Sequence, residues 1–165
     1  MKILIAYISK TGTTEEIARK ICAILGESSN ADADASADQI EVLPISEVDS
    51  IEQYDRLILG SPINGMKVLP EFKAFIEEKI ANSGKLVDIF AVSYMFERGR
   101  KIWRNAIKKD VEKIQALAHA SSAEIFGGRL QNVLPRFARL IFGLPRDLPL
   151  DLRDWGKIES WARKL

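Results

Sequence analysis

The first apolar run of the chain is continuous rather than alternating. Residues 3–8, Ile-Leu-Ile-Ala-Tyr-Ile, contain no charged or amide position, which is typical of a strand covered on both faces of a parallel sheet. A polar stretch follows at 9–14, and Ile17, Ile21 and Leu25 then recur at helical spacing. This pattern predicts a strand, a tight loop and a helix.

The same unit recurs along the chain. Apolar runs at 56–59 and 86–92 each lead through a short loop into a helical pattern, at about 69–81 and about 100–118. Pro70 stands near the start of the first of these helices, where proline is tolerated. Two shorter strands are expected at 39–43 and 123–126, the second ending at Gly127-Gly128.

Five strands that alternate with helices predict an α/β fold with a doubly wound five-stranded parallel sheet. Among the orders that short right-handed crossovers leave open, 2-1-3-4-5 is the commonest. A single domain is expected over residues 1–165, with a mobile surface loop at 28–38. The last helix is expected to begin after Asp154, a good N-cap, and to bury Trp155, Ile158, Ala162 and Leu165.

Composition narrows the class of protein. Hydrophobic residues make up 47% of the 165 residues and the net charge is +1, so a folded globule without a nucleic-acid partner is expected. One cysteine and one histidine exclude a Cys/His zinc site and an intrachain disulfide. Cys22 is interpreted as a packing residue inside a helix, and His119 as a surface residue. A lone cysteine and the absence of a long apolar segment favour the cytoplasm.

The loop at 9–14, Ser-Lys-Thr-Gly-Thr-Thr, carries the strongest chemical signal. In an open parallel sheet the loops after the strands meet at one edge, where ligands bind. Hydroxyl groups, backbone amides and the positive end of a helix together suit a phosphate monoester, and Gly12 permits close approach. Helix capping by Ser and Thr is the alternative explanation. The spacings of the Walker and dinucleotide-binding glycine loops are not present.

These residues resemble a known family. The pattern Ser-x-Thr-Gly-x-Thr after Ile-Leu-Ile-Ala-Tyr is similar to the FMN phosphate-binding loop of flavodoxin-like proteins. Weaker similarities extend over nearly the whole chain, at Leu59-Gly60-Ser61-Pro62-Ile63, Gly127-Gly128-Arg129-Leu130 and Asp154-Trp155. With a basic and apolar insert, they resemble most the branch that contains the menaquinone-dependent protoporphyrinogen dehydrogenase.

The resemblance implies a cofactor, FMN, and a set of residues around it. One group would hold the phosphate: Ser9, Lys10, Thr11, Gly12, Thr13 and Thr14. A second group would border one side of the isoalloxazine ring: Ser61, Pro62, Ile63, Asn64 and Gly65. A third would border the other side: Ser93, Tyr94 and Met95, with Tyr94 either stacked on the ring or an ordinary aromatic residue at a strand end. No catalytic residue and no metal ligand is expected, because the flavin performs the redox chemistry.

Charge is distributed unevenly along the chain. Residues 1–94 carry 9 Lys and Arg against 15 Asp and Glu, and residues 95–165 carry 15 against 8. Eight basic residues follow the loops at the expected FMN edge, where they would either attract an anionic substrate or form a solvated surface. They are Arg98, Arg100, Lys101, Arg104, Arg129, Arg136, Arg139 and Arg146.

The segment 135–143, Pro-Arg-Phe-Ala-Arg-Leu-Ile-Phe-Gly, has an apolar arc of roughly 200° at 100° per residue. Three roles fit an arc so wide: contact with a membrane interface, cover for a hydrophobic substrate, or a subunit interface. Docking into the core is the fourth explanation. A location at the inner face of the membrane, as a peripheral protein, would follow from the first role.

The resemblance and the charge pattern together imply an FMN-dependent oxidoreductase. It would pass electrons from an anionic hydrophobic substrate, similar to protoporphyrinogen, to a quinone. The alternative hypothesis is a flavodoxin that carries electrons for a protein redox partner and docks through its basic face. A small flavoprotein with a regulatory role is a third hypothesis.

Overall fold

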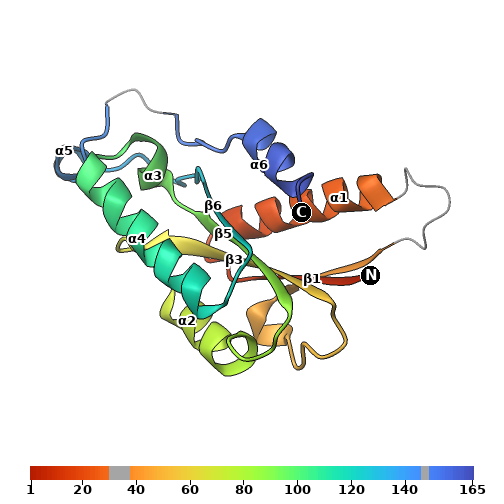
Figure 1. Cartoon of the computed structure of the whole chain (residues 1–165). Helices are drawn as coiled ribbons and strands as arrows, with labels where there is room; N and C mark the ends of the chain where they lie inside the picture. Colours follow the sequence, from red (N-terminus) through yellow and green to blue (C-terminus); the bar gives the residue numbers. More distant parts are fainter. Residues whose placement is uncertain (30–37, 146–148) are drawn as a thin grey trace.

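The computed structural model describes residues 1–29, 38–145 and 149–165 of the chain (Figure 1). Part of the loop expected at 28–38, and Arg146, lie outside the described residues. The strands are β1 Lys2–Tyr7, β2 Gln39–Pro44, β3 Arg56–Asn64, β4 Lys67–Val68, β5 Leu86–Val92 and β6 Ser122–Phe126. The helices are α1 Thr13–Ser29, η1 Ile45–Glu47, α2 Pro70–Phe75 with its wider continuation η2 Ile76–Ile80, α3 Tyr94–Arg98, α4 Lys101–Leu117, α5 Arg136–Phe142 and α6 Trp155–Ala162.

The sheet has the order β2-β1-β3-β5-β6, and these five strands are parallel. The predicted order 2-1-3-4-5 is therefore confirmed, because β4 is only a short antiparallel partner of β3. All five parallel strands deliver their carboxyl ends to one edge of the sheet. The order changes direction between β1 and β3, so the loops that follow these strands flank the switch point.

Helices cover both faces of the sheet, as Figure 1 shows. One face buries Leu4, Leu57 and Ile89 against α2 and α4. The other buries residues such as Ile5 and Phe90 against α1 and α6. Burial on both faces explains why the first strand is apolar without alternation.

A polar network lies in the sheet near the amino ends of β3 and β5. The Arg56 guanidinium donates to one Asp88 oxygen, with Nε–O and N–O distances of 2.9 and 2.6 Å. Ser122 donates to the other Asp88 oxygen at 2.7 Å. Because Asp88 is only 1% exposed, Arg56 and Asp88 form a buried ion pair. Removal of either partner would leave the charge of the other uncompensated in the core.

Three sequence-based expectations differ from the structure. β3 continues through Gly60 and Ser61 to Asn64 instead of ending before them. The third loop contains the short helix α3, which was not predicted. Trp155 is 38% exposed, and Trp161 is buried in its place. The reason is local: the Arg153 guanidinium lies 4.6 Å from the centre of the Trp155 ring and holds it at the surface.

Two expectations about single residues are confirmed. Cys22 is half-buried and packs against the core under α1, where burial raises the pKa of its thiol. His119 is exposed just after α4 and has a positive φ of 50°. In the described part of the chain, no helix combines the length and apolar character needed to cross a bilayer.

Candidate functional site

The loop between β1 and α1 is held in a fixed shape by its own residues. Gly12 has a φ of +83°, a conformation that side chains with a Cβ rarely adopt. Its N–H donates to the Ser9 hydroxyl at 3.0 Å, and its carbonyl accepts the Glu16 N–H at 2.9 Å, which starts α1. Thr13 and Thr14 are buried at the first turn. The 17-residue helix α1 thus directs its positive end to this loop.

The second wall of the site is the hairpin of β3 and β4. Ser61 is fully buried; its hydroxyl donates to the Pro62 carbonyl at 3.0 Å and accepts the Leu69 N–H at 3.4 Å. Gly65 makes the turn with a φ of +57°. On the opposite side, the Asp110 carboxylate of α4 accepts the Val68 N–H at 2.9 Å. These contacts fix the hairpin, and the Ser61 hydroxyl is occupied by two hydrogen bonds to backbone groups.

The third wall joins the ends of β5 and β6. The Ser93 N–H donates to the Phe126 carbonyl at 2.9 Å. A Cβ on Gly128 would lie 2.9 Å from the Tyr94 nitrogen, so the two loops approach each other closely because residue 128 has no side chain. The Tyr94 hydroxyl donates to the Pro149 carbonyl at 2.8 Å, and burial raises the Tyr94 pKa. Met95 packs against the cluster around Ile107.

Between the three walls lies a cavity of about 300 Å³. Its lining contains eight of the predicted cofactor residues: Lys10, Thr11, Thr13, Thr14, Pro62, Ile63, Asn64 and Tyr94. Ser9 and Gly12 line a different cavity on the other side of the same loop. The remaining four, Ser61, Gly65, Ser93 and Met95, support the walls without lining either cavity. The cavity also includes residues absent from the predicted set: Leu69, Val92, Gly128, Arg129 and Leu130.

The chemistry of this lining fits a flavin mononucleotide. Hydroxyl groups and Lys10 gather at the helix N-terminus, where a phosphate is stabilised by the helix dipole and by backbone amides. Apolar and aromatic groups such as Ile63, Val92 and Tyr94 line the same cavity and suit a flat ring system. Arg129 and Leu130 were missed because their loop was interpreted only as a family similarity, although the Gly127-Gly128 pair before them indicated a close approach.

Charged groups at the mouth of the cavity neutralise one another. Glu16 accepts from Arg129 at 2.7 Å and also pairs with Arg153. The hydrogen bond from Arg153 is the main reason that the Glu16 pKa lies below its ordinary value. Arg153 donates to Asp151 at 2.6 Å as well, which lowers the Asp151 pKa. Arg129, predicted among the substrate-attracting cations, is thus engaged by a carboxylate.

The basic residues on or next to α3, α4 and α5 are less compensated. Arg98, Lys101 and Arg136 are exposed and form no ion pair within the described residues. The Arg100 side chain donates to the Leu140 carbonyl at 2.9 Å, and the Trp103 side chain donates to the Ile141 carbonyl at 3.2 Å. Side chains at the start of α4 therefore hold α5 through backbone carbonyls of α5.

Three apolar side chains of α5 remain at the surface, whereas Phe142 is half-buried and packs against the Trp103 ring. Phe137 is 68% and Leu140 is 73% exposed, and Ile141 is also exposed. Docking of this helix wholly into the core is therefore wrong for these residues. Ile102 on α4 and Val133 before α5 are exposed as well. We call Ile102, Val133, Phe137, Leu140 and Ile141 the apolar surface, and it is flanked by the cations of the preceding paragraph.

An open parallel sheet with a hydroxyl-rich loop at the α1 N-terminus and a cavity at the carboxyl edge defines a flavodoxin-like protein. The flavodoxin domain family matches residues 4–146, and the chain belongs to that family. The family places it in the class of flavin-binding oxidoreductases and electron-transfer proteins. No curated protein matches the sequence significantly.

Solved structures agree with the fold. Oxidised flavodoxin 2 from Bacillus cereus is 24% identical with a TM-score of 0.56, and the alignment covers 99% of this chain and 96% of that one. An oxidoreductase from Corynebacterium diphtheriae is 14% identical with a TM-score of 0.58, and the alignment covers 100% of this chain and 98% of that one. A Fusobacterium nucleatum flavodoxin mutant bound to flavin mononucleotide is 20% identical with a TM-score of 0.50, and the alignment covers 74% of this chain and 66% of that one. The family and the FMN-bound structure agree with the prediction of FMN as cofactor.

Proposed function

We propose that the chain binds FMN and acts as an oxidoreductase that passes electrons from an anionic hydrophobic substrate, similar to protoporphyrinogen, to a quinone. The observation that carries this proposal is the combination, on α3, α4 and α5 and the segment before α5, of cations that form no ion pair within the described residues and of exposed apolar side chains. Arg98, Lys101 and Arg136 supply the charge, and the apolar surface adjoins them. Positive potential of this kind raises the local concentration of an anionic substrate.

The predicted residues take distinct roles in this proposal. Bound FMN supplies reversible transfer of one or two electrons. The loop 9–14 holds its phosphate through backbone amides, hydroxyls and Lys10. Pro62, Ile63 and Asn64 border one side of the ring and Tyr94 the other. Ser61, Gly65, Ser93 and Met95 keep these walls in place, since their contacts lie within the protein.

Contact with a membrane surface belongs to the same proposal. A quinone and a porphyrinogen are both hydrophobic, so an enzyme that uses them gains from working at the bilayer. The apolar surface would enter the interface while Arg136 meets anionic headgroups, as in peripheral proteins. This arrangement corresponds to a peripheral location at the inner face of the membrane.

The test is anaerobic turnover of the FMN-loaded protein. Protoporphyrinogen and a menaquinone analogue are added, and porphyrin fluorescence is followed against a control without protein. The proposal expects quinone-dependent turnover, with kcat/KM reduced about tenfold in Arg98→Ser combined with Lys101→Ser, because two attractive charges are lost. Lys113→Ser, an exposed change further along α4, the helix that also carries Lys101, is the control and should retain full activity. Absence of turnover with FMN bound would overturn the proposal.

Family membership favours one alternative function, electron transfer to a protein partner. In that case the cations Arg98, Lys101 and Arg136 would dock an acidic surface of the partner. A redox titration distinguishes the two functions. A carrier needs well-separated potentials for the first and second electron, whereas an enzyme that exchanges electrons in pairs does not.

A further inference from the structure

Arg129 joins the flavin cavity to the first turn of α1. It is one of the residues that line the cavity of about 300 Å³. Its Nη2 atom donates to Glu16 Oε1 at 2.7 Å, and the Glu16 N–H donates to the Gly12 carbonyl at the start of α1. The same Glu16 oxygen would lie 4.0 Å from a Cβ on Gly12. The guanidinium is therefore held beside the loop 9–14, at the end of the cavity where the proposed function places the phosphate.

The main chain of residue 129 is fixed as well. It forms an antiparallel bridge with Asp151, and a hydrogen bond on each side of this bridge joins the same two segments, at 2.8 and 3.0 Å. The preceding residue, Gly128, lies against the Tyr94 main chain. The main chain thus keeps to the third wall while the side chain extends to α1. Because the guanidinium is held in place by the protein, an anion that binds it has little additional side-chain freedom to remove.

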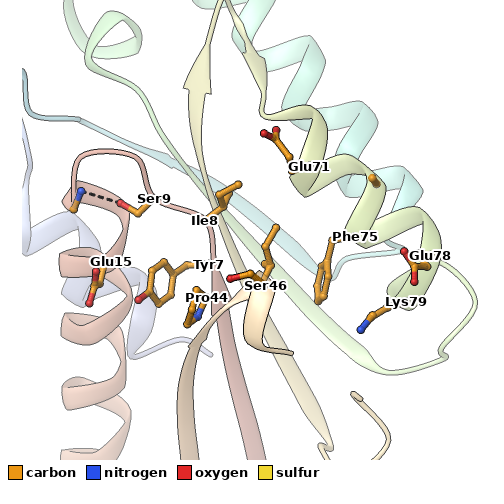
Figure 2. Close-up of a pocket in the computed structure, with 13 residues that line it drawn as sticks. Tyr7, Ile8, Ser9, Glu15, Pro44, Ser46, Glu71, Phe75, Glu78 and Lys79 are labelled. Carbon is orange, nitrogen blue, oxygen red and sulfur yellow. Dashed lines mark hydrogen bonds between the residues drawn. The ribbon is translucent and has the colours of Figure 1, made fainter. Parts of the chain in front are cut away.

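The two cavities on either side of the loop 9–14 differ in charge. Among the described residues, the lining of the flavin cavity contains two cations, Lys10 and Arg129, and no carboxylate. The cavity on the other side is lined by three carboxylates and one ammonium group (Figure 2): Glu15, Glu71, Glu78 and Lys79. A phosphate at this loop is therefore attracted to the side that Arg129 lines and repelled from the other side.

Glu16 is shared between two arginines. Its other oxygen pairs with Arg153, which also pairs with Asp151. These two guanidinium groups and two carboxylates balance one another, and the exposed Lys10 adds a positive charge on the loop. A guanidinium carries donors on three nitrogens, and the bond to Glu16 comes from Nη2. Arg129 can therefore donate to a phosphate oxygen while it keeps its ion pair.

We propose that Arg129 is a second cation of the flavin phosphate site, beside Lys10, and that it makes the site select the phosphorylated flavin over riboflavin. The inference rests on the proposed function, because it takes the phosphate to lie at the loop 9–14. Hydrogen bonds from a guanidinium to a phosphate are stronger than those from neutral hydroxyl and amide groups. Arg129 thus serves the cofactor and not the attraction of a substrate.

The experiment is a titration of the flavin-free protein with FMN and with riboflavin, each followed by flavin fluorescence. The two ligands differ only in the phosphate, so the ratio of their Kd values measures what the phosphate contributes. Arg129→Gln removes the charge and should raise the Kd of FMN about tenfold, while that of riboflavin changes less than twofold. Arg129→Lys retains the charge and should bind FMN within about threefold of the unmutated protein.

Arg19→Gln is the matched control. Arg19 also pairs with a glutamate of α1, Glu15, at 2.8 Å, but it does not line the flavin cavity. Its loss should leave both Kd values within about twofold, since exposed charges at a distance are screened. Because the pair of Arg129 and Glu16 is partly exposed, its loss costs little stability and the variants should fold, which their melting temperatures check.

Each outcome decides the matter. Equal weakening of both flavins by Arg129→Gln would indicate a structural role and overturn the inference, and so would an FMN Kd of Arg129→Lys as high as that of Arg129→Gln. An FMN Kd that Arg129→Gln leaves unchanged would overturn the inference and leave the proposed function standing. Absence of FMN binding to the unmutated protein would overturn both.

Discussion

Gly12 offers the sharpest test of where a flavin phosphate would lie. Its φ of +83° puts it in a backbone region that costs an alanine roughly 1–2 kcal/mol. A Cβ at this position would meet only Glu16 Oε1, at 4.0 Å, which is ordinary contact. Asn and Asp tolerate positive φ better than other residues with a Cβ. Gly12→Asn and Gly12→Asp therefore form a pair of nearly equal shape and equal backbone strain that differs in charge.

The charge difference sets the expected magnitude. Two unit charges about 4 Å apart interact by about 4 kcal/mol at the effective dielectric constant of about 20 that applies near a protein surface. Allowing for a longer distance to the phosphate, about 3 kcal/mol separates the two variants, which corresponds to about a 100-fold difference in the Kd of FMN. Gly12→Asn should bind FMN within about tenfold of the unmutated protein.

The assay is fluorescence titration with FMN at low and at high salt, together with urea unfolding of the flavin-free proteins. The unfolding free energies of the two variants should agree within about 0.5 kcal/mol, since their strain is alike. The difference in Kd should shrink at high salt because exposed charges are screened. Equal FMN affinity of Gly12→Asn and Gly12→Asp would refute the placement of the phosphate at this loop.

Three further outcomes follow from other parts of the molecule. Asp88→Ala should lower the free energy of unfolding by about 3–5 kcal/mol because it removes the carboxylate partner of the buried Arg56, which then keeps only its hydrogen bond to the Leu165 oxygen; urea unfolding measures this, and a loss under 1 kcal/mol would contradict it. Glu16→Gln should cost at most about 1 kcal/mol at neutral pH, as a partly exposed pair does. Since Arg153 lowers the Glu16 pKa in the folded state, this stabilisation is present above the ordinary pKa of 4.5 and is lost at lower pH, so thermal melts of the two proteins should converge in acid. Phe137→Ser should reduce binding to vesicles with anionic lipids severalfold without changing FMN affinity, and unchanged vesicle binding would argue against the membrane contact.

The sheet and its helices could be predicted because burial on both faces leaves a direct mark in the sequence. The continuous apolar run of β1 and the three- and four-residue spacing of Ile17 and Ile21 each have one good explanation. The end of β3 could not be predicted in the same way. Gly60 is interpreted locally as a turn residue, yet it lies within β3. The position needs a glycine because a Cβ there would be 2.1 Å from the Phe90 ring. That requirement comes from a residue thirty positions away.

The candidate site was predictable only in part, for a related reason. The loop 9–14 is a local motif, so its residues could be named from the sequence. Tyr94 and Gly128 meet because two distant strands end side by side, and no local pattern encodes that approach. The burial of Trp155 was predicted wrongly because spacing alone cannot show that its indole packs against the Arg153 guanidinium at the surface. The cavity on the other side of the loop 9–14 is lined by residues of β1, β2, η1, α1, α2 and η2, and no local sequence motif indicates it.

The segment that carries α5, between residues 130 and 150, begins and ends at neighbouring points of the molecule. This arrangement affects how related proteins can diversify. The Leu130 N–H donates to the Leu150 carbonyl at 2.8 Å, and the Leu152 N–H donates to the Gly128 carbonyl at 3.0 Å. The two ends of the excursion therefore lie next to each other, as in a compact surface loop that can be exchanged between proteins. A short turn between residues 130 and 150 should replace it and leave the sheet folded. The segment can accordingly be gained, lost or exchanged between related proteins while the sheet stays the same.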